Sequence, residues 1–170
     1  MKALNYIRWF VTWLNDWVGR LVSYLIIPIF LMLILEVFLR YAIGRPTVWT
    51  NELAQYLFGA YVMLSGAYLL AHKGHVSVDI LYSRFSIRAQ AALSILTSFL
   101  FFVFVYVLAT EGASIALQAV EELEHSGTAW NAPIWPFKLT IPIGAALLFL
   151  QGVSNLIENI FVLFGLDENI

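Results

Sequence analysis

The stretch that decides the fold, residues 40–79, reads RYAIGRPTVWTNELAQYLFGAYVMLSGAYLLAHKGHVSVD. It holds a short polar turn, an apolar segment at Thr50–Ala71 and a second polar turn. A bilayer core about 30 Å thick needs roughly 20 apolar residues per helix, so the middle segment has the length of a membrane span. The stretch therefore predicts a helix with one polar cluster at each membrane face.

Three further segments of this kind surround it. The chain of 170 residues is 61% hydrophobic and only 12% charged, whereas a soluble domain is about half apolar and about a quarter charged. We expect an all-α membrane protein with four transmembrane helices, forming a single domain over residues 1–170. The predicted spans are residues 17–43, 50–71, 88–118 and 134–162.

Composition excludes several classes of protein. The chain has no cysteine, which excludes disulfide exchange and cysteine-ligated metals. A net charge of -2 without a basic patch gives no reason to expect a nucleic-acid partner. Because the spans use nearly the whole chain, no room remains for a soluble domain.

The first residues, 1–15, have the pattern of an interfacial helix. Tyr6, Phe10, Trp13 and Trp17 recur at helical spacing, and aromatic rings prefer the headgroup region of a bilayer. An amphipathic helix lying on the membrane is therefore predicted before the first span, with a frayed tail as the alternative.

The distribution of positive charge predicts the orientation. Cytoplasmic loops carry an excess of lysine and arginine, and with both termini inside, the inner side has the larger share. The inner segments carry Lys2, Arg8, Arg20, Lys73, Arg84 and Arg88, and the outer segments carry Arg40, Arg45 and Lys138.

A carboxylate lies near the outer end of the first span. Glu36 is one helical turn before Arg40, and an unpaired charge at this depth would cost about 2–3 kcal/mol. We interpret the two as an ion pair; the alternative is a carboxylate that carries a proton or contacts substrate. Pro28 should bend this helix.

The turn and the helix that follow it supply further candidates. Gly44 and Pro46 suit a tight turn near Arg45, and Trp49 belongs at the interface. Thr50 is the expected N-cap, and Glu52 is expected to face the helix N-terminus and Arg40 or Arg45.

Small residues on the second span predict close packing. Gly59 and Gly66 are seven residues apart and share a face with Ala67, which lets another helix approach. The polar turn beyond it contains His75 and Asp79, for which a role in holding the loop is expected. A short interfacial helix or packed loop is expected near residues 76–85.

The second half of the chain has two polar groups. Glu121, Glu122, Glu124 and His125 make an acidic loop, and solvated acids are favoured there over a metal site. Trp135 and Lys138 return the chain to the interface. On the fourth span, Gln151, Asn155 and Glu158 form one polar stripe, which in lipid must face protein or water, unless it already lies among the headgroups.

As a set, these motifs resemble the DctQ-type small membrane subunit of tripartite ATP-independent periplasmic (TRAP) transporters. The resemblance covers nearly the whole chain. Asn51 stands where that family often has an acid. The matching residues are Arg40–Tyr41, Gly44–Arg45–Pro46, Trp49–Thr50–Asn51–Glu52, Gly66–Ala67, Gly74–His75–Val76–Ser77–Val78–Asp79, Pro133–Ile134–Trp135, Lys138 and Ile141–Pro142–Ile143–Gly144.

The resemblance implies a bacterial inner-membrane protein with both termini cytoplasmic. It implies a large permease subunit as partner, which carries the sodium and substrate sites, and a periplasmic binding protein that delivers an organic acid. The small subunit would support the large one in the bilayer. No catalytic, substrate-binding, metal or cofactor site is expected in this chain.

Two other functions stay open at the level of sequence. A stand-alone proton-coupled exporter would need Glu36 to be unpaired and central. A membrane anchor of a redox complex would need haem-ligating histidines on facing helices, whereas His72 and His75 are neighbours at one helix end.

Overall fold

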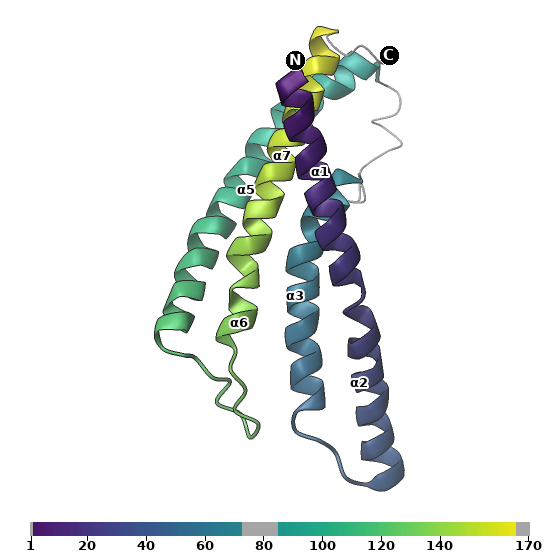
Figure 1. Ribbon diagram of the computed structural model, residues 1–170, viewed down its shortest axis with the longest axis vertical. Coiled ribbons are helices and arrows are strands. Elements are labelled where there is room, and N and C mark those ends of the chain that lie inside the picture. Colours follow the sequence, from purple (N-terminus) through teal and green to yellow (C-terminus); the bar gives the residue numbers. More distant parts are fainter. Residues whose placement is uncertain (1, 73–84, 166–170) are drawn as a thin grey trace.

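The computed structural model is a row of long helices, and it describes residues 2–72 and 85–165. α5 lies against α7, α7 against α3, and α3 against α1 and α2. α1 begins and α7 ends at the same end of the molecule, whereas the connections 44–49 and 122–134 lie at the other, which we call the loop end (Figure 1). The elements are α1 (Lys2–Ser23), α2 (Ile26–Phe38), η1 (Leu39–Ile43), α3 (Thr50–Ala71), α5 (Ile87–Glu121), α6 (Trp135–Lys138) and α7 (Thr140–Phe164).

The described chain has four helical segments that are long and apolar enough to cross a membrane, as predicted. They are Leu4–Ile43, Thr50–Ala71, Ile87–Glu121 and Trp135–Phe164. The second coincides with its predicted bounds, and the third extends three residues further, because nothing in the sequence before Glu121 breaks a helix. Ser86 caps this third helix by accepting a hydrogen bond from the amide of Ala89 at 3.4 Å.

The predicted interfacial helix and the start of the first predicted span form one continuous helix. α1 runs without interruption from Lys2 to Ser23, so no helix end separates an interfacial piece from a span near residue 16. The expected aromatic stripe of Tyr6, Phe10, Trp13 and Trp17 is exposed, while α1 buries the opposite face on the rest of the chain. The helix continues because residues 14–18 contain neither proline nor glycine to end it.

Pro28 interrupts the first segment, as expected. α1 and α2 are separated by a turn at residues 24–25, one helical turn before the proline. Proline lacks the amide that would bond to the carbonyl of Tyr24, and its ring crowds that carbonyl. The long first segment therefore bends where the sequence places Pro28.

The turn at residues 44–49 depends on a glycine. α2 passes into the π-helical η1, and Gly44 follows with a left-handed backbone (φ 71°). There the amide of Arg45 bonds to the carbonyl of Leu39 at 3.0 Å. A residue with a side chain rarely adopts this conformation, so the predicted role of Gly44 is confirmed.

Helix packing uses small residues, and the closest approach is at a glycine of α7. A Cβ atom on Gly59 would have no neighbour within 4 Å, and one on Gly66 would be in ordinary contact with Leu148 at 3.6 Å. A Cβ on Gly144 of α7 would instead lie 2.5 Å from the carbonyl oxygen of Met63 on α3. Gly59 therefore contacts no other helix of the described chain, whereas Gly66 contacts α7. Ala67 is buried as expected.

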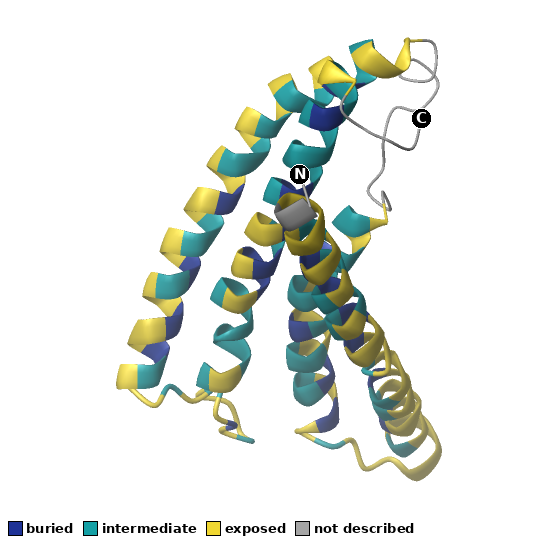
Figure 2. Ribbon diagram, turned by 45° about the horizontal axis from the view of Figure 1, so that its top comes forward, coloured by how far each residue is buried: buried dark blue, intermediate teal, exposed yellow. Residues whose placement is uncertain are grey.

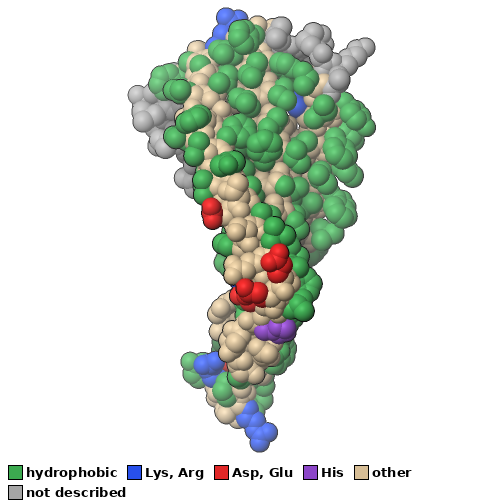
Figure 3. Space-filling model, turned by 90° about the vertical axis from the view of Figure 1, so that its left-hand side faces the viewer, with side chains coloured by type: hydrophobic (Ala, Val, Ile, Leu, Met, Phe, Trp, Pro, Cys, Tyr) green, Lys and Arg blue, Asp and Glu red, His purple; other side chains and the backbone are tan. Residues whose placement is uncertain are grey.

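Burial follows the inner faces of the row (Figure 2). The outward faces of α2 and α5 are exposed and carry bulky apolar side chains. Figure 3 shows hydrophobic side chains covering much of the side that α5 presents, with acidic side chains nearer the loop end. This distribution is typical of helices that face lipid.

Candidate functional site

The Glu36 carboxylate is the centre of a polar cluster at the loop end. Its side chain is buried, with the residue 6% exposed. Oxygen Oε1 accepts bonds from Arg40 Nη2 at 2.6 Å and Nε at 3.2 Å. The predicted ion pair is therefore confirmed, and it places a charged hydrogen bond at the end of α2.

The second oxygen of Glu36 has partners that sequence reasoning missed. Oε2 accepts from the Thr47 amide at 3.1 Å, from the Thr47 hydroxyl at 2.6 Å and from the Thr50 hydroxyl at 2.7 Å. The cluster thus joins α2, the turn at residues 44–49 and α3. The signal was available, since a buried carboxylate has two oxygens and one arginine rarely satisfies both.

Thr50 does not act as the predicted N-cap. α3 begins at Thr50 after Trp49, and no side chain caps its first turn. The Thr50 hydroxyl instead donates to Glu36, beside the Thr47 hydroxyl. Thr50 is already the first helical residue and Trp49 occupies the N-cap position, so the Thr50 hydroxyl is not placed to cap the helix.

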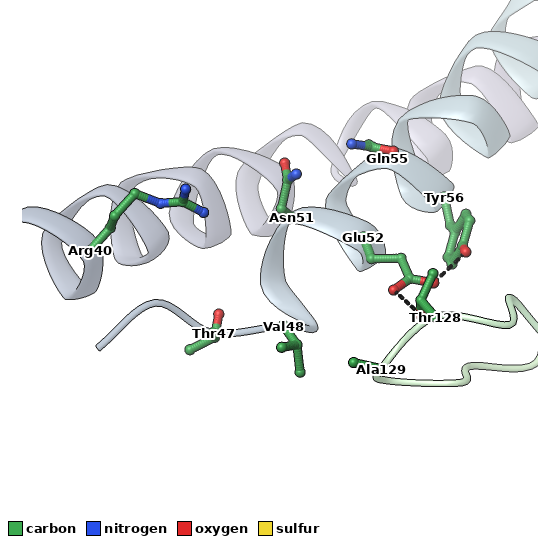
Figure 4. Close-up of a pocket in the computed structure, with 9 residues that line it drawn as sticks. All are labelled: Arg40, Thr47, Val48, Asn51, Glu52, Gln55, Tyr56, Thr128 and Ala129. Atoms are coloured by element: carbon green, nitrogen blue, oxygen red, sulfur yellow. Dashed lines mark hydrogen bonds between the residues drawn. The ribbon is translucent and has the colours of Figure 1, made fainter. Parts of the chain in front are cut away.

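A second cluster connects α3 to the connection 122–134. Glu52 accepts from the Tyr56 hydroxyl at 2.5 Å and from the Thr128 hydroxyl at 2.7 Å (Figure 4). Tyr56 also stacks on Phe137 of α6, with ring centroids 5.2 Å apart. Neither of the predicted partners of Glu52, Arg40 or Arg45, bonds to it, and Arg40 is turned to Glu36. Thr128 was not predicted as a partner, since it is 76 residues away in the sequence.

A shallow, open pocket of about 440 Å³ lies between these two clusters. Its wall combines the guanidinium of Arg40 with the carboxamides of Asn51 and Gln55 (Figure 4). The remaining lining residues are Thr47, Val48, Glu52, Tyr56, Thr128 and Ala129. Both carboxylates beside the pocket have both oxygens bonded within the chain, and the carboxamides of Asn51 and Gln55 each add a donor and an acceptor.

The polar stripe of α7 faces protein. Gln151 is 2% exposed and accepts a bond from the amide of Asn15 at 2.8 Å. Gln151 donates in turn to Asn155 at 2.9 Å, and Asn155 donates to the carbonyl of Leu70 at 3.4 Å. Gln151 and Asn155 therefore pack against α1 and α3, while the Glu158 side chain at the end of the stripe is 47% exposed.

The stripe ends in an ion pair. Arg8 of α1 donates to Glu158 of α7 at 2.7 Å. Arg8 and Asn15 are seven residues apart on α1, as Gln151 and Glu158 are on α7, so the antiparallel helices meet in two matched polar pairs. Their partners could not be found from sequence because Arg8 and Glu158 are 150 residues apart.

The connection 122–134 is held by its own contacts. Lys138 pairs with Glu124 at 2.5 Å, and an isolated antiparallel bridge joins His125 to Pro133. Trp49 directly precedes α3 and Trp135 begins α6, and both side chains are partly exposed. His125 contacts the carbonyl of Leu123, and no group of three metal-ligating side chains occurs in the part of the chain that the structure describes.

The candidates at the opposite end of α3 are only partly visible. His72 is the C-cap of α3, and its Nδ1 lies 3.1 Å from the carbonyl of Tyr68 and 3.6 Å from Asp16. His75 and Asp79, with the expected interfacial segment near residues 76–84, lie outside the described residues.

Together these clusters tie helices to one another. A family model, "Tripartite ATP-independent periplasmic transporters, DctQ component", matches residues 29–162, which include the Glu36 and Glu52 clusters and the polar stripe. A search of curated proteins finds no match. The chain belongs to the DctQ family and is a TRAP transporter small membrane subunit.

Proposed function

We propose that this chain supports a large permease subunit in the sodium-driven uptake of an organic acid that a periplasmic binding protein delivers. The family membership motivates the proposal. The observation that carries it is the Glu36 cluster. There the one buried acid of the first segment accepts hydrogen bonds from the chain on both of its carboxylate oxygens. A carboxylate held in this way stabilises a fold and is a poor proton carrier.

The same reasoning extends to the rest of the site. Glu52, Gln151 and Glu158 each bond to another element of the chain. Polar side chains inside a membrane protein usually mark a transport path or a helix contact, and these belong to helix contacts. The chain therefore acts as a scaffold, and it has no catalytic role.

We place the protein in a bacterial inner membrane with both termini in the cytoplasm. The excess of lysine and arginine on the side of the N-terminus supports this orientation. It puts the Glu36 and Glu52 clusters on the periplasmic side. Fusions of a periplasm-active reporter after Ala129 and of a cytoplasm-active reporter after Phe164 test the orientation; activity in the reverse pattern would overturn it.

Reconstitution tests the function. Proteoliposomes with this chain alone should take up no organic acid under a sodium gradient. Proteoliposomes that also contain its large permease subunit should do so when the binding protein is supplied. Uptake by the lone chain, driven by protons and lost in Glu36→Gln, would instead support a stand-alone exporter.

A further inference from the structure

Charged residues and one histidine divide the described chain into four apolar bands. Each band is about twenty residues long, the length that crosses a bilayer. The only charge within a band is Glu36, which pairs with Arg40. The bands lie between Arg20 and Arg40, Glu52 and His72, Arg88 and Glu111, and Lys138 and Glu158.

The contacts between helices show that the bands of α5 and α3 are not level. Glu111, at the end of the α5 band, precedes Gly112, which packs against Ile141 of α7. Gly144, about one turn further along α7, packs against Met63 in the middle of α3. Glu111 therefore lies level with the middle of α3, whereas the α3 band begins at the loop end of that helix.

The other contacts show a shift in the same direction. Thr50, the first residue of α3, bonds to Glu36, and Arg40 lies one turn further toward the loop end. At the opposite end, the Arg88 guanidinium of α5 lies beside Gly165, which follows the end of α7. The bands are therefore displaced stepwise from α2 to α3, α7 and α5, by about one helical turn per helix.

The position of Glu111 indicates how a bilayer fits these bands. Its side chain is exposed, and among the described residues it has no hydrogen bond or ion pair. In a bilayer centred on α3 with upright helices, this carboxylate would lie deep in the hydrocarbon, where an unpaired charge is costly. A bilayer that follows the staggered bands places Glu111 at the same surface as Arg40 and Lys138. Figure 1 shows the same slant, since α2 extends furthest at the loop end and α5 stops short of it.

α1 follows the opposite edge of the bands. Asp16 lies 3.6 Å from His72, where the α3 band ends, and Arg8 donates at 2.7 Å to Glu158, where the α7 band ends. α1 thus runs along this edge from one helix to the next. Aromatic rings prefer the headgroup region of a bilayer, and the exposed side of α1 carries Tyr6, Trp9, Phe10, Trp13 and Trp17.

We propose that α1 lies along the bilayer surface with its aromatic face among lipid headgroups, and that the bilayer crosses the row of helices obliquely, along the staggered bands. A shift of about one turn per helix, over a helix spacing of about 8–10 Å, corresponds to helices tilted by roughly 30–40°. Membrane helices reach such tilts. The proposal depends neither on which surface is cytoplasmic nor on the proposed function.

Depth measurements on α5 test the oblique crossing. The chain has no cysteine, so a single cysteine can carry a nitroxide label in proteoliposomes, and its accessibility to oxygen and to a nickel chelate reports depth. Leu100→Cys, at the middle of the α5 band, should place the label deep in the hydrocarbon. Ser114→Cys, beyond Glu111, should place it at the surface. Both positions are exposed. An upright bilayer centred on α3 reverses this order, so a deeper label at position 114 would overturn the proposal.

Depth measurements on α1 test its position at the surface. Labels at Trp9, Trp13 and Trp17 should lie at nearly the same depth. If α1 instead continued the first span out of the bilayer, the depth would change by about 6 Å from each label to the next, and such steps would overturn the proposal. Phe30 and Phe38 of α2 are the control, because labels at these exposed positions should differ in depth.

Discussion

At the scale of residues, the Glu36 cluster shows how a buried carboxylate is held by donors from its own helix and from the turn after it. Glu36 is buried and needs several donors, which come from three separate places in the sequence: Arg40, Thr47 and Thr50. Arg40 is half exposed and can reach water. The two members of the ion pair therefore depend on each other unequally.

We expect Glu36→Gln to lower the free energy of unfolding more than Arg40→Gln does. Losing the charge at Glu36 weakens every bond in the cluster, and the free energy of unfolding should fall by about 1–3 kcal/mol. Without Arg40, the carboxylate still accepts bonds from Thr47 and Thr50. The double variant should cost less than the sum of the two. Unfolding in mixed detergent micelles measures this, with Arg45→Gln, an exposed cation in the same turn, as the control. Normal stability of Glu36→Gln with abolished transport by the assembled complex would show that Glu36 takes part in transport.

At the scale of elements, helix contacts depend on close backbone approach and on buried amides. α7 is the central element, since α5, α3 and α1 all pack on it. Gly144 permits the approach of α3, and Gln151 fixes the position of α1. Each contact predicts a different response to substitution.

Gly144→Ala should destabilise the chain, and Gly59→Ala should not. A Cβ at position 144 would meet the backbone oxygen of Met63 at 2.5 Å, so α3 and α7 must separate, at about 1–3 kcal/mol. Position 59 has open space, and alanine there should add about 0.5–1 kcal/mol of helix stability. Thermal unfolding of the chain purified alone decides it; equal tolerance of both changes would refute this account of α3–α7 packing.

The α1–α7 contact should respond to paired changes. Gln151→Leu leaves Asn15, which is 1% exposed, without its partner, and the loss should be about 1–3 kcal/mol. Adding Asn15→Leu should restore much of it, because two apolar side chains need no hydrogen bond. If the double variant unfolds more easily than Gln151→Leu alone, the hydrogen bond between Asn15 and Gln151 does not explain the stability of this contact.

At the scale of the whole molecule, the row has two halves, α1–α3 and α5–α7. They meet along α3 and α7, and the Glu52–Thr128 bond and the Tyr56–Phe137 stack add a link at the loop end. Because Glu52 and Tyr56 already have partners within the chain, this link should affect assembly and not substrate recognition.

Glu52→Ala should lower the yield of assembled transporter. The Thr128 hydroxyl and the Tyr56 hydroxyl lose their shared acceptor, and Thr128→Val should give a smaller loss because Tyr56 still bonds to Glu52. The half-saturating substrate concentration of the remaining complex should change by less than about twofold. Uptake in proteoliposomes, normalised to assembled complex, provides the measurement; a tenfold rise at normal assembly would place Glu52 on the substrate path.

The sequence by itself determined the class of fold, the number of candidate spans, the Glu36–Arg40 pair, the bend before Pro28 and the turn at Gly44. Each depends on residues within a few positions of one another or on hydrophobic length, which a linear sequence records directly. It could not find Thr128 for Glu52 or Arg8 for Glu158, and it assigned to helix capping the Thr50 hydroxyl that donates to Glu36. Those contacts depend on which helices become neighbours and at what register. Tertiary packing decides both, because a buried acceptor takes the strongest donor in reach, however distant in the chain.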